Sequence, residues 1–152
     1  PNGREEETVM RLSRVGYDNC IGYLEGGMEA WIAAGKKTEK VATVSAENFY
    51  SDGYKKGIET IDVRKPSEFD SAHLINGESK PLDFIFDWID SKDKNHPYMI
   101  HCAGGYRSMI AISILKANGY NNLTNVNGGF GAISKVAGVD AEIVSQACSS
   151  SK

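Results

Sequence analysis

One cysteine is placed where its thiol could act as a nucleophile. A short apolar run predicts a strand over Tyr98–His101, and the chain passes from it directly into Cys102. Gly104 and Gly105 follow, and the pattern then predicts a helix over 108–118. Two glycines let the backbone curl so that its N–H groups converge on the sulfur, and a helix N-terminus adds to the stabilisation of negative charge. We therefore expect a thiolate with a pKa below the ordinary value of about 8.5.

Alternatively, Cys102 is a buried structural cysteine. The two glycines and the Arg-Ser helix start favour a reactive cysteine instead. Four residues separate Cys102 from Arg107. Cysteine-dependent phosphatases and arsenate reductases hold their anion in a longer loop, so this loop suits a smaller guest such as a terminal sulfur. The segment resembles the active-site loop of the rhodanese (sulfurtransferase) family, in which C-x-x-G-x-R-[ST] holds a cysteine persulfide. The matching positions are Cys102, Gly105, Arg107 and Ser108.

An upstream block is similar to a second pattern of the same family. Residues 61–69 resemble its D-x-R strand end followed by E-F on a short helix, and 73–77 resemble its G-H-I-x-G-A turn. Ala72 stands where glycine is usual and Glu78 where a small residue is usual, so the turn is expected to differ in shape. We expect the acidic and basic side chains of this block to form an ion-pair network that braces the loop. The supporting residues are Asp62, Arg64, Glu68 and His73.

The resemblance implies a sulfurtransferase. Cys102 would attack the outer sulfur of a small donor such as thiosulfate, carry it as a persulfide, and pass it to a thiol or to cyanide. No cofactor is expected beyond this covalent intermediate. Arg107 would either orient an anionic donor or fold back onto a carboxylate, Tyr106 would form a pocket wall, and Ser108 would be a hydrogen-bonding residue at the helix start. The expected substrate-binding residues are Ala103, Gly104, Gly105, Tyr106, Arg107 and Ser108.

One other interpretation stays open beside this one: a non-catalytic persulfide carrier or docking module that serves a fused or neighbouring enzyme. A Cys–His pair is not expected, because His101 precedes Cys102 on a strand and should point to the opposite face. His73 matches a turn histidine of the family pattern, so we expect a structural role for it as well.

An imperfect internal repeat organises the chain. Residues 15–19 match 118–122, and Leu24–Gly27 with Trp31 match Val126–Gly129 with Ile133. We therefore expect residues 1–40 to be the C-terminal part of a first rhodanese-like repeat plus a linker, with an upstream domain missing. Residues 41–140 would be a complete rhodanese-like domain, and 141–152 a C-terminal helix and tail. The first segment also resembles tandem rhodanese units attached to metallo-β-lactamase-fold hydrolases.

The remaining pattern alternates strands with helices, which predicts an α/β fold with a parallel sheet and helices on both faces. Cys102 would lie at the carboxyl edge of a central strand, where such folds place ligands. Strands are expected at 20–24, 41–44, 58–63, 79–82, 98–101 and 123–126. Helices are expected at 5–14, 28–34, 45–50, 66–71, 83–90, 108–118, 129–136 and 140–147.

Composition sets outer bounds on function. The chain is 41% hydrophobic and 24% charged, with a net charge of −3 and a pI near 5.6. These values argue against nucleic acid or an anionic membrane as the main partner, and no apolar run reaches the about 18 residues of a membrane span. Cys20, Cys102 and Cys148 form no C-x-x-C pair, which favours a reducing, cytoplasmic setting and no metal site. A homo-oligomer stays open.

Overall fold

The computed structural model describes residues 3–13 and 18–145. The chain divides into two compact units, Pro1–Lys40 and Val41–Lys152, and each is described by itself. In the described part of the chain, no helix is long and apolar enough to cross a membrane.

The described residues of the first unit form two helices, α1 (Glu5–Ser13) and α2 (Gly27–Ala33). Gly35, with φ of +66°, follows α2, whereas residue 14, the predicted end of the first helix, lies outside the described residues. The strand predicted at 20–24 is wrong: this segment is irregular, and Cys20 within it is exposed. A strand needs a neighbour to satisfy its backbone, and residues 3–13 and 18–40 offer no other strand.

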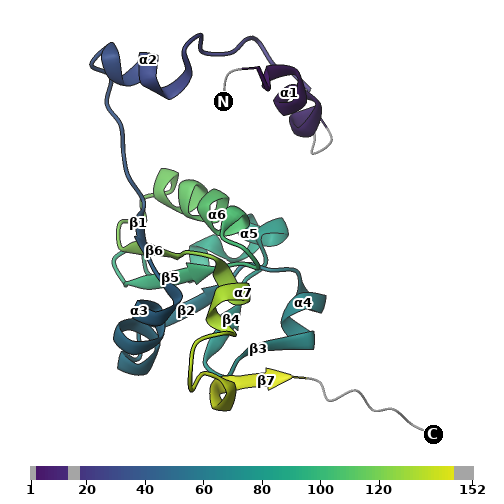
Figure 1. Cartoon of the computed structure of the whole chain (residues 1–152), viewed down its shortest axis with the longest axis vertical. Coiled ribbons are helices and arrows are strands. Elements are labelled where there is room, and N and C mark those ends of the chain that lie inside the picture. The colour runs from purple at the N-terminus through teal and green to yellow at the C-terminus, as the bar shows by residue number, and fades with distance from the viewer. Residues whose placement is uncertain (1–2, 14–17, 146–152) are drawn as a thin grey trace, which may run out of the picture. The chain divides into compact units, whose positions relative to one another are not determined.

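The second unit is built on a five-stranded sheet in which every neighbouring pair is parallel. The strand order is β1-β6-β5-β2-β4, so β5 is central and β1 lies at an edge. Parallel pairing places the carboxyl ends of β2, β5 and β6 side by side at one edge of the sheet (Figure 1). The strands are β1 (Ala42–Val44), β2 (Glu59–Asp62), β4 (Gly77–Ser79), β5 (Tyr98–His101) and β6 (Leu123–Val126).

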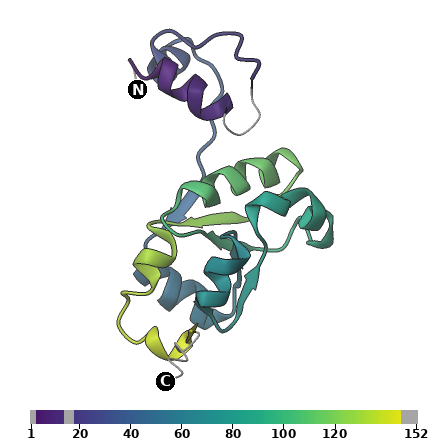
Figure 2. The same ribbon diagram turned by 90° about the vertical axis from the view of Figure 1, so that its right-hand side faces the viewer.

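Helices cover both faces of this sheet, which confirms the predicted fold class (Figures 1 and 2). One core lies between the sheet and helices α5 (Ile85–Trp88) and α6 (Tyr106–Ala117). The other lies against α3 (Ala46–Asn48) and α7 (Gly129–Ile133). Alternation along β5 divides its side chains between them, with Ile100 in the first core and Met99 in the second.

Local structure departs from the expected pattern in several elements. A π-helical turn (Phe49–Gly53) and a 3-10 turn (Tyr54–Lys56) extend α3, and β4 lies two residues before the predicted strand. The helix predicted at 83–90 is broken into 3-10 turns, Leu82–Phe84 and Ile89–Ser91, on either side of α5. The carbonyl of Pro81 accepts hydrogen bonds from the amide of Phe84 and from Nε1 of Trp88, which hold this segment in a tighter turn. Helix α7 is also shorter than predicted.

A second, two-stranded sheet was not predicted. It pairs β3 (Ala72–Leu74), which follows α4 (Pro66–Ser71), antiparallel with β7 (Ile143–Ser145). The helix expected at 140–147 is therefore wrong: a 3-10 turn (Asp140–Glu142) leads into β7, and the predicted tail beyond residue 145 lies outside the described residues. β-Branched side chains favour a strand where a partner strand is available, and β3 supplies that partner.

We predict that Leu74→Ala destabilises the protein by about 2–5 kcal/mol, because Leu74 is 1% exposed and joins β3 to the second core. The matched control is Ile75→Ala, since Ile75 is next in the chain but 52% exposed and should change stability by about 0.5 kcal/mol or less. Urea unfolding measures both. Equal costs for the two variants would contradict the placement of β3.

Candidate active site

Cys102 lies immediately after the central strand β5, at the edge of the sheet where β2 and β6 also end. Its side chain is packed into the core between the sheet and α6, and the residue is 1% exposed. Ala103 and Gly104, the next two residues, are exposed. A bulky reagent therefore has no access to the sulfur without movement of the loop.

The backbone of the loop turns its amides toward the sulfur. The Gly105 N–H donates to Cys102 Sγ at 3.1 Å. Gly105 has φ of +100°, a left-handed conformation that glycine adopts without steric cost, and it is the N-cap of α6. Helix α6 begins at Tyr106, two residues before the predicted start, so Arg107 and Ser108 both lie in its first turn.

Burial and hydrogen bonding act in opposite directions on the thiol. Burial by itself raises the pKa of Cys102. The amide and hydroxyl of Ser108, with the amides of Gly105 and Gly104, stabilise the thiolate and outweigh burial, so the pKa is lowered from its ordinary value. The sulfur is thus favoured as a thiolate by the backbone of its own loop.

The carbonyl groups of the loop are held by α7. The Phe130 N–H donates to the carbonyl of Cys102 at 2.7 Å, and the Gly131 N–H donates to that of Ala103 at 3.0 Å. This approach requires a glycine at 129, because a Cβ there would lie 2.2 Å from the Cys102 carbonyl oxygen. Sequence reasoning missed these contacts. The available signal was the Gly-Gly pair at 128–129, which was used only to define the repeat.

A second residue that sequence reasoning missed is Asn125, on β6. Its Oδ1 accepts a hydrogen bond from Ser108 Oγ at 2.7 Å, and that oxygen lies 3.6 Å from Cys102 Sγ. Ser108 Oγ also lies 3.0 Å from the carbonyl oxygen of Gly105. Both Ser108 and Asn125 are buried. Ser108 therefore connects the helix start, the neighbouring strand and the sulfur.

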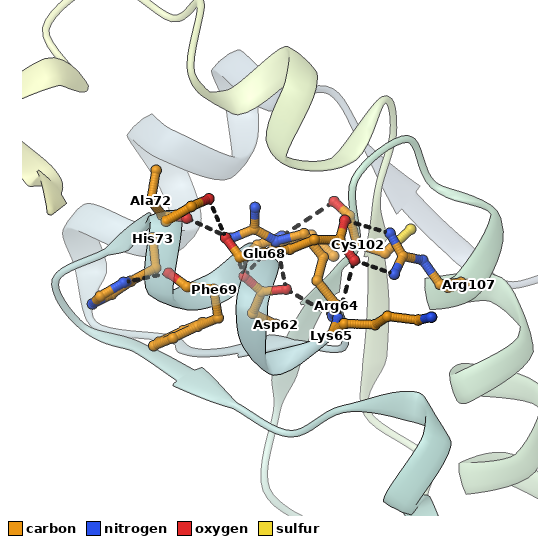
Figure 3. Close-up of polar contacts among 11 residues, drawn as sticks. Asp62, Arg64, Lys65, Glu68, Phe69, Ala72, His73, Cys102 and Arg107 are labelled. Atoms are coloured by element: carbon orange, nitrogen blue, oxygen red, sulfur yellow. Dashed lines mark hydrogen bonds and ion pairs between the residues drawn. The ribbon is translucent and has the colours of Figure 1, made fainter. Parts of the chain in front are cut away.

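Arg107 adopts the second of its two expected arrangements and folds back onto a carboxylate. Its Nη1 and Nη2 donate to the two carboxylate oxygens of Glu68 on α4, at 2.6 and 2.8 Å (Figure 3). Hydrogen bonding from Arg107 holds the pKa of Glu68 well below its usual range, at about 2. Glu68 also accepts the N–H of Lys65 and so caps α4. This bidentate pair ties the active-site loop to α4.

The predicted network of Asp62, Arg64 and Glu68 separates into two hydrogen-bonded pairs. Arg64 forms a bidentate pair with Asp62, with contacts of 2.6 and 2.8 Å to Oδ2, and also donates to the carbonyl of Ala72 at 2.7 Å. Its guanidinium lies 4.1 Å from the ring centroid of Phe130. The Phe130 N–H donates to the Cys102 carbonyl. The buried Arg64–Asp62 pair therefore supports α7, the helix that holds the loop.

His101 and His73 both lie away from the sulfur. His101 is fully buried against Phe49 and Phe130, in the core on the other face of the sheet, and burial lowers its pKa. His73 stacks on Phe69, and its Nδ1 lies 2.8 Å from the Phe69 carbonyl oxygen; Figure 3 places it at the far end of the cluster from Cys102. Neither arrangement presents an imidazole base to the thiol.

Tyr106 is 80% exposed, so it does not form the pocket wall that was expected of it. Among residues 3–13 and 18–145, no group of three or more His, Cys, Asp or Glu side chains is arranged to hold a metal ion. The chemistry available at this edge is therefore that of one thiol in a cradle of amides.

The chain is similar to known proteins of one family. Residues 45–135 match the family described as "Rhodanese-like domain". Thiosulfate sulfurtransferase GlpE of Pseudomonas putida is 28% identical over 76 residues, which cover 50% of this chain and 69% of that protein. The uncharacterized protein YqhL of Bacillus subtilis is 28% identical over 92 residues, covering 60% and 72%. A rhodanese-like domain protein from Staphylococcus aureus superposes with a TM-score of 0.55 at 32% identity, covering 61% of this chain and 91% of that one.

We predict that Gly129→Ala destabilises the protein by about 1–3 kcal/mol more than Gly57→Ala. Both glycines have positive φ, +54° and +76°, so both variants carry backbone strain, but only at 129 does the new Cβ meet the Cys102 carbonyl. Thermal and urea unfolding measure the difference. If the two variants unfold alike, the close approach of α7 to the loop is not a determinant of its structure.

Proposed function

The chain belongs to the family of rhodanese-like domains, and from that premise we propose that it is a sulfurtransferase which carries sulfur as a persulfide on Cys102. The observation that carries the proposal is the set of loop amides converging on a buried sulfur, with the Gly105 N–H 3.1 Å from Sγ. Such a cradle stabilises a negative charge on sulfur without a side-chain base.

The proposed reaction begins with the Cys102 thiolate attacking the outer sulfur of thiosulfate. A new S–S bond forms to Sγ, the S–S bond of the donor breaks, and sulfite leaves with the electron pair. Cys102 Sγ becomes neutral, and the negative charge passes to the terminal sulfur of the persulfide. The amides of the loop, from Ala103 to Ser108, would then stabilise that terminal charge.

A small acceptor would complete the cycle. A thiolate, or cyanide in vitro, attacks the terminal sulfur and releases Cys102 as the thiolate. Abundant low-molecular-weight thiols favour the reducing cytoplasm as the place of this reaction. In this scheme Arg107 holds the loop through Glu68, to which both of its terminal nitrogens donate.

A persulfide carrier is the second candidate, and the burial of Cys102 favours it. The residue is 1% exposed, which restricts the approach of an acceptor. A carrier loads one sulfur and retains it until a partner protein arrives, whereas an enzyme cycles with free thiols or cyanide.

We predict that thiosulfate adds one sulfur to the Cys102 peptide of the reduced, folded protein and that cyanide removes it. Intact and peptide mass spectrometry measures both steps. Cys102→Ser should take up no cyanide-labile sulfur. Cys20→Ser is the matched control, because Cys20 is exposed and lies in the other unit, and this variant should load as the parent does.

Absence of sulfur on Cys102 in the folded protein would contradict thiosulfate sulfurtransfer. Loading that persists in Cys102→Ser would place the reaction on another cysteine.

A further inference from the structure

Ser108 carries one hydroxyl proton but has three acceptors within reach. Its Oγ lies 2.7 Å from Asn125 Oδ1, 3.0 Å from the Gly105 carbonyl oxygen and 3.6 Å from Cys102 Sγ. A hydroxyl donates one hydrogen bond and accepts through its lone pairs. The direction of this single proton therefore decides whether Ser108 stabilises negative charge on the sulfur.

The surroundings of the hydroxyl leave it dependent on these protein acceptors. Ser108 is fully buried, Cys102 is 1% exposed and Asn125 is 4% exposed. A buried hydroxyl proton without an acceptor is costly. The proton consequently needs a partner in every charge state of the sulfur.

The charge on Sγ alternates in the proposed reaction. Before attack Sγ is a thiolate and a strong acceptor, whereas in the persulfide Sγ is neutral and the charge lies on the terminal sulfur. A Ser108 hydroxyl that donates to the Sγ thiolate therefore loses its anionic acceptor on Sγ when the persulfide forms. Asn125 Oδ1, the shortest contact of the hydroxyl, is the acceptor placed to take it.

We propose that Asn125 is a positioning residue that accepts the Ser108 proton when Cys102 Sγ is neutral and releases it to Sγ when Sγ is a thiolate. Ionisation of the thiol then breaks the Ser108–Asn125 hydrogen bond, and formation of the persulfide restores it. Asn125 thus disfavours the free thiolate and favours the sulfur-loaded state. The role in loading rests on the proposed sulfurtransferase function, whereas the effect on the thiol does not.

Other charged groups near the sulfur are the same in every variant needed for the test. Arg107 of α6 lies on the loop side and is paired with Glu68 of α4. On the far side of β5 lie His101 and the pair of Asp62 with Arg64. Differences among Asn125 and Ser108 variants therefore report on the hydroxyl proton.

The test is a pH titration of Cys102 by the NMR shift of its ¹³C-labelled Cβ, with Cys20→Ser and Cys148→Ser as background. Asn125→Ala should lower the Cys102 pKa by about one unit, the order expected for one hydrogen bond to a charged group. Ser108→Ala should raise it. The double variant should match Ser108→Ala, because Asn125 acts only through the hydroxyl.

Asn125→Leu is measured beside Asn125→Ala, because it retains side-chain volume and separates loss of the amide from the opening of a cavity. Circular dichroism establishes that each variant is folded. An unchanged or raised pKa in the folded Asn125 variants would overturn the proposal. The proposal would also be overturned if Asn125→Ala shifted the Cys102 pKa by the same amount in the Ser108→Ala background.

A loading measurement separates this proposal from the proposed function. At a fixed ratio of thiosulfate to sulfite, intact mass should show the equilibrium constant for sulfur loading about tenfold lower in Asn125→Ala, corresponding to the one-unit shift in pKa. If Asn125→Ala and the parent had the same equilibrium constant for loading, the role of Asn125 in the persulfide state would be overturned. If the parent takes up no sulfur, the proposed function fails, and the titration still decides whether Asn125 controls the Ser108 proton.

Discussion

The convergence of backbone amides on a buried sulfur is the constraint on which the rest of the second unit depends. A loop can direct its N–H groups inward only if its carbonyls have acceptable partners elsewhere. The amides at the start of α7 are those partners for Cys102 and Ala103. They reach the loop because β5 and β6 are parallel neighbours that end at the same edge. The parallel sheet, the glycine at 129 and the lowered pKa of the Cys102 thiol are therefore parts of one arrangement.

Both arginines near the active-site loop are paired with carboxylates. Arg107 is bound by Glu68, and Arg64 is bound by Asp62. Each pair joins an element of the site to its neighbour rather than presenting charge to a ligand. Hydrogen bonds from the loop amides and from Ser108 lower the pKa of Cys102 against the effect of burial.

Features set by local sequence could be predicted, and features set by distant contacts could not. The apolar run of β5, the glycines of the loop and the helix that follows are continuous in the chain, so the position of Cys102 and the loop around it could be predicted. Asn125 and Phe130 reach the loop only through sheet pairing, which spacing does not reveal. The same reason explains the two wrong elements: residues 20–24 lack a partner strand among the described residues of the first unit, and 143–145 gain one in β3.

The measurement that tests this account most directly is the pKa of Cys102 in the folded protein against the same protein in denaturant. Ultraviolet absorbance of the thiolate gives both values, with Cys102→Ser as the blank. The account predicts a lower pKa in the folded state, because hydrogen bonds from the loop outweigh burial. A folded-state pKa equal to or above the denatured value would show that burial dominates, and it would contradict activation of the sulfur by its own loop.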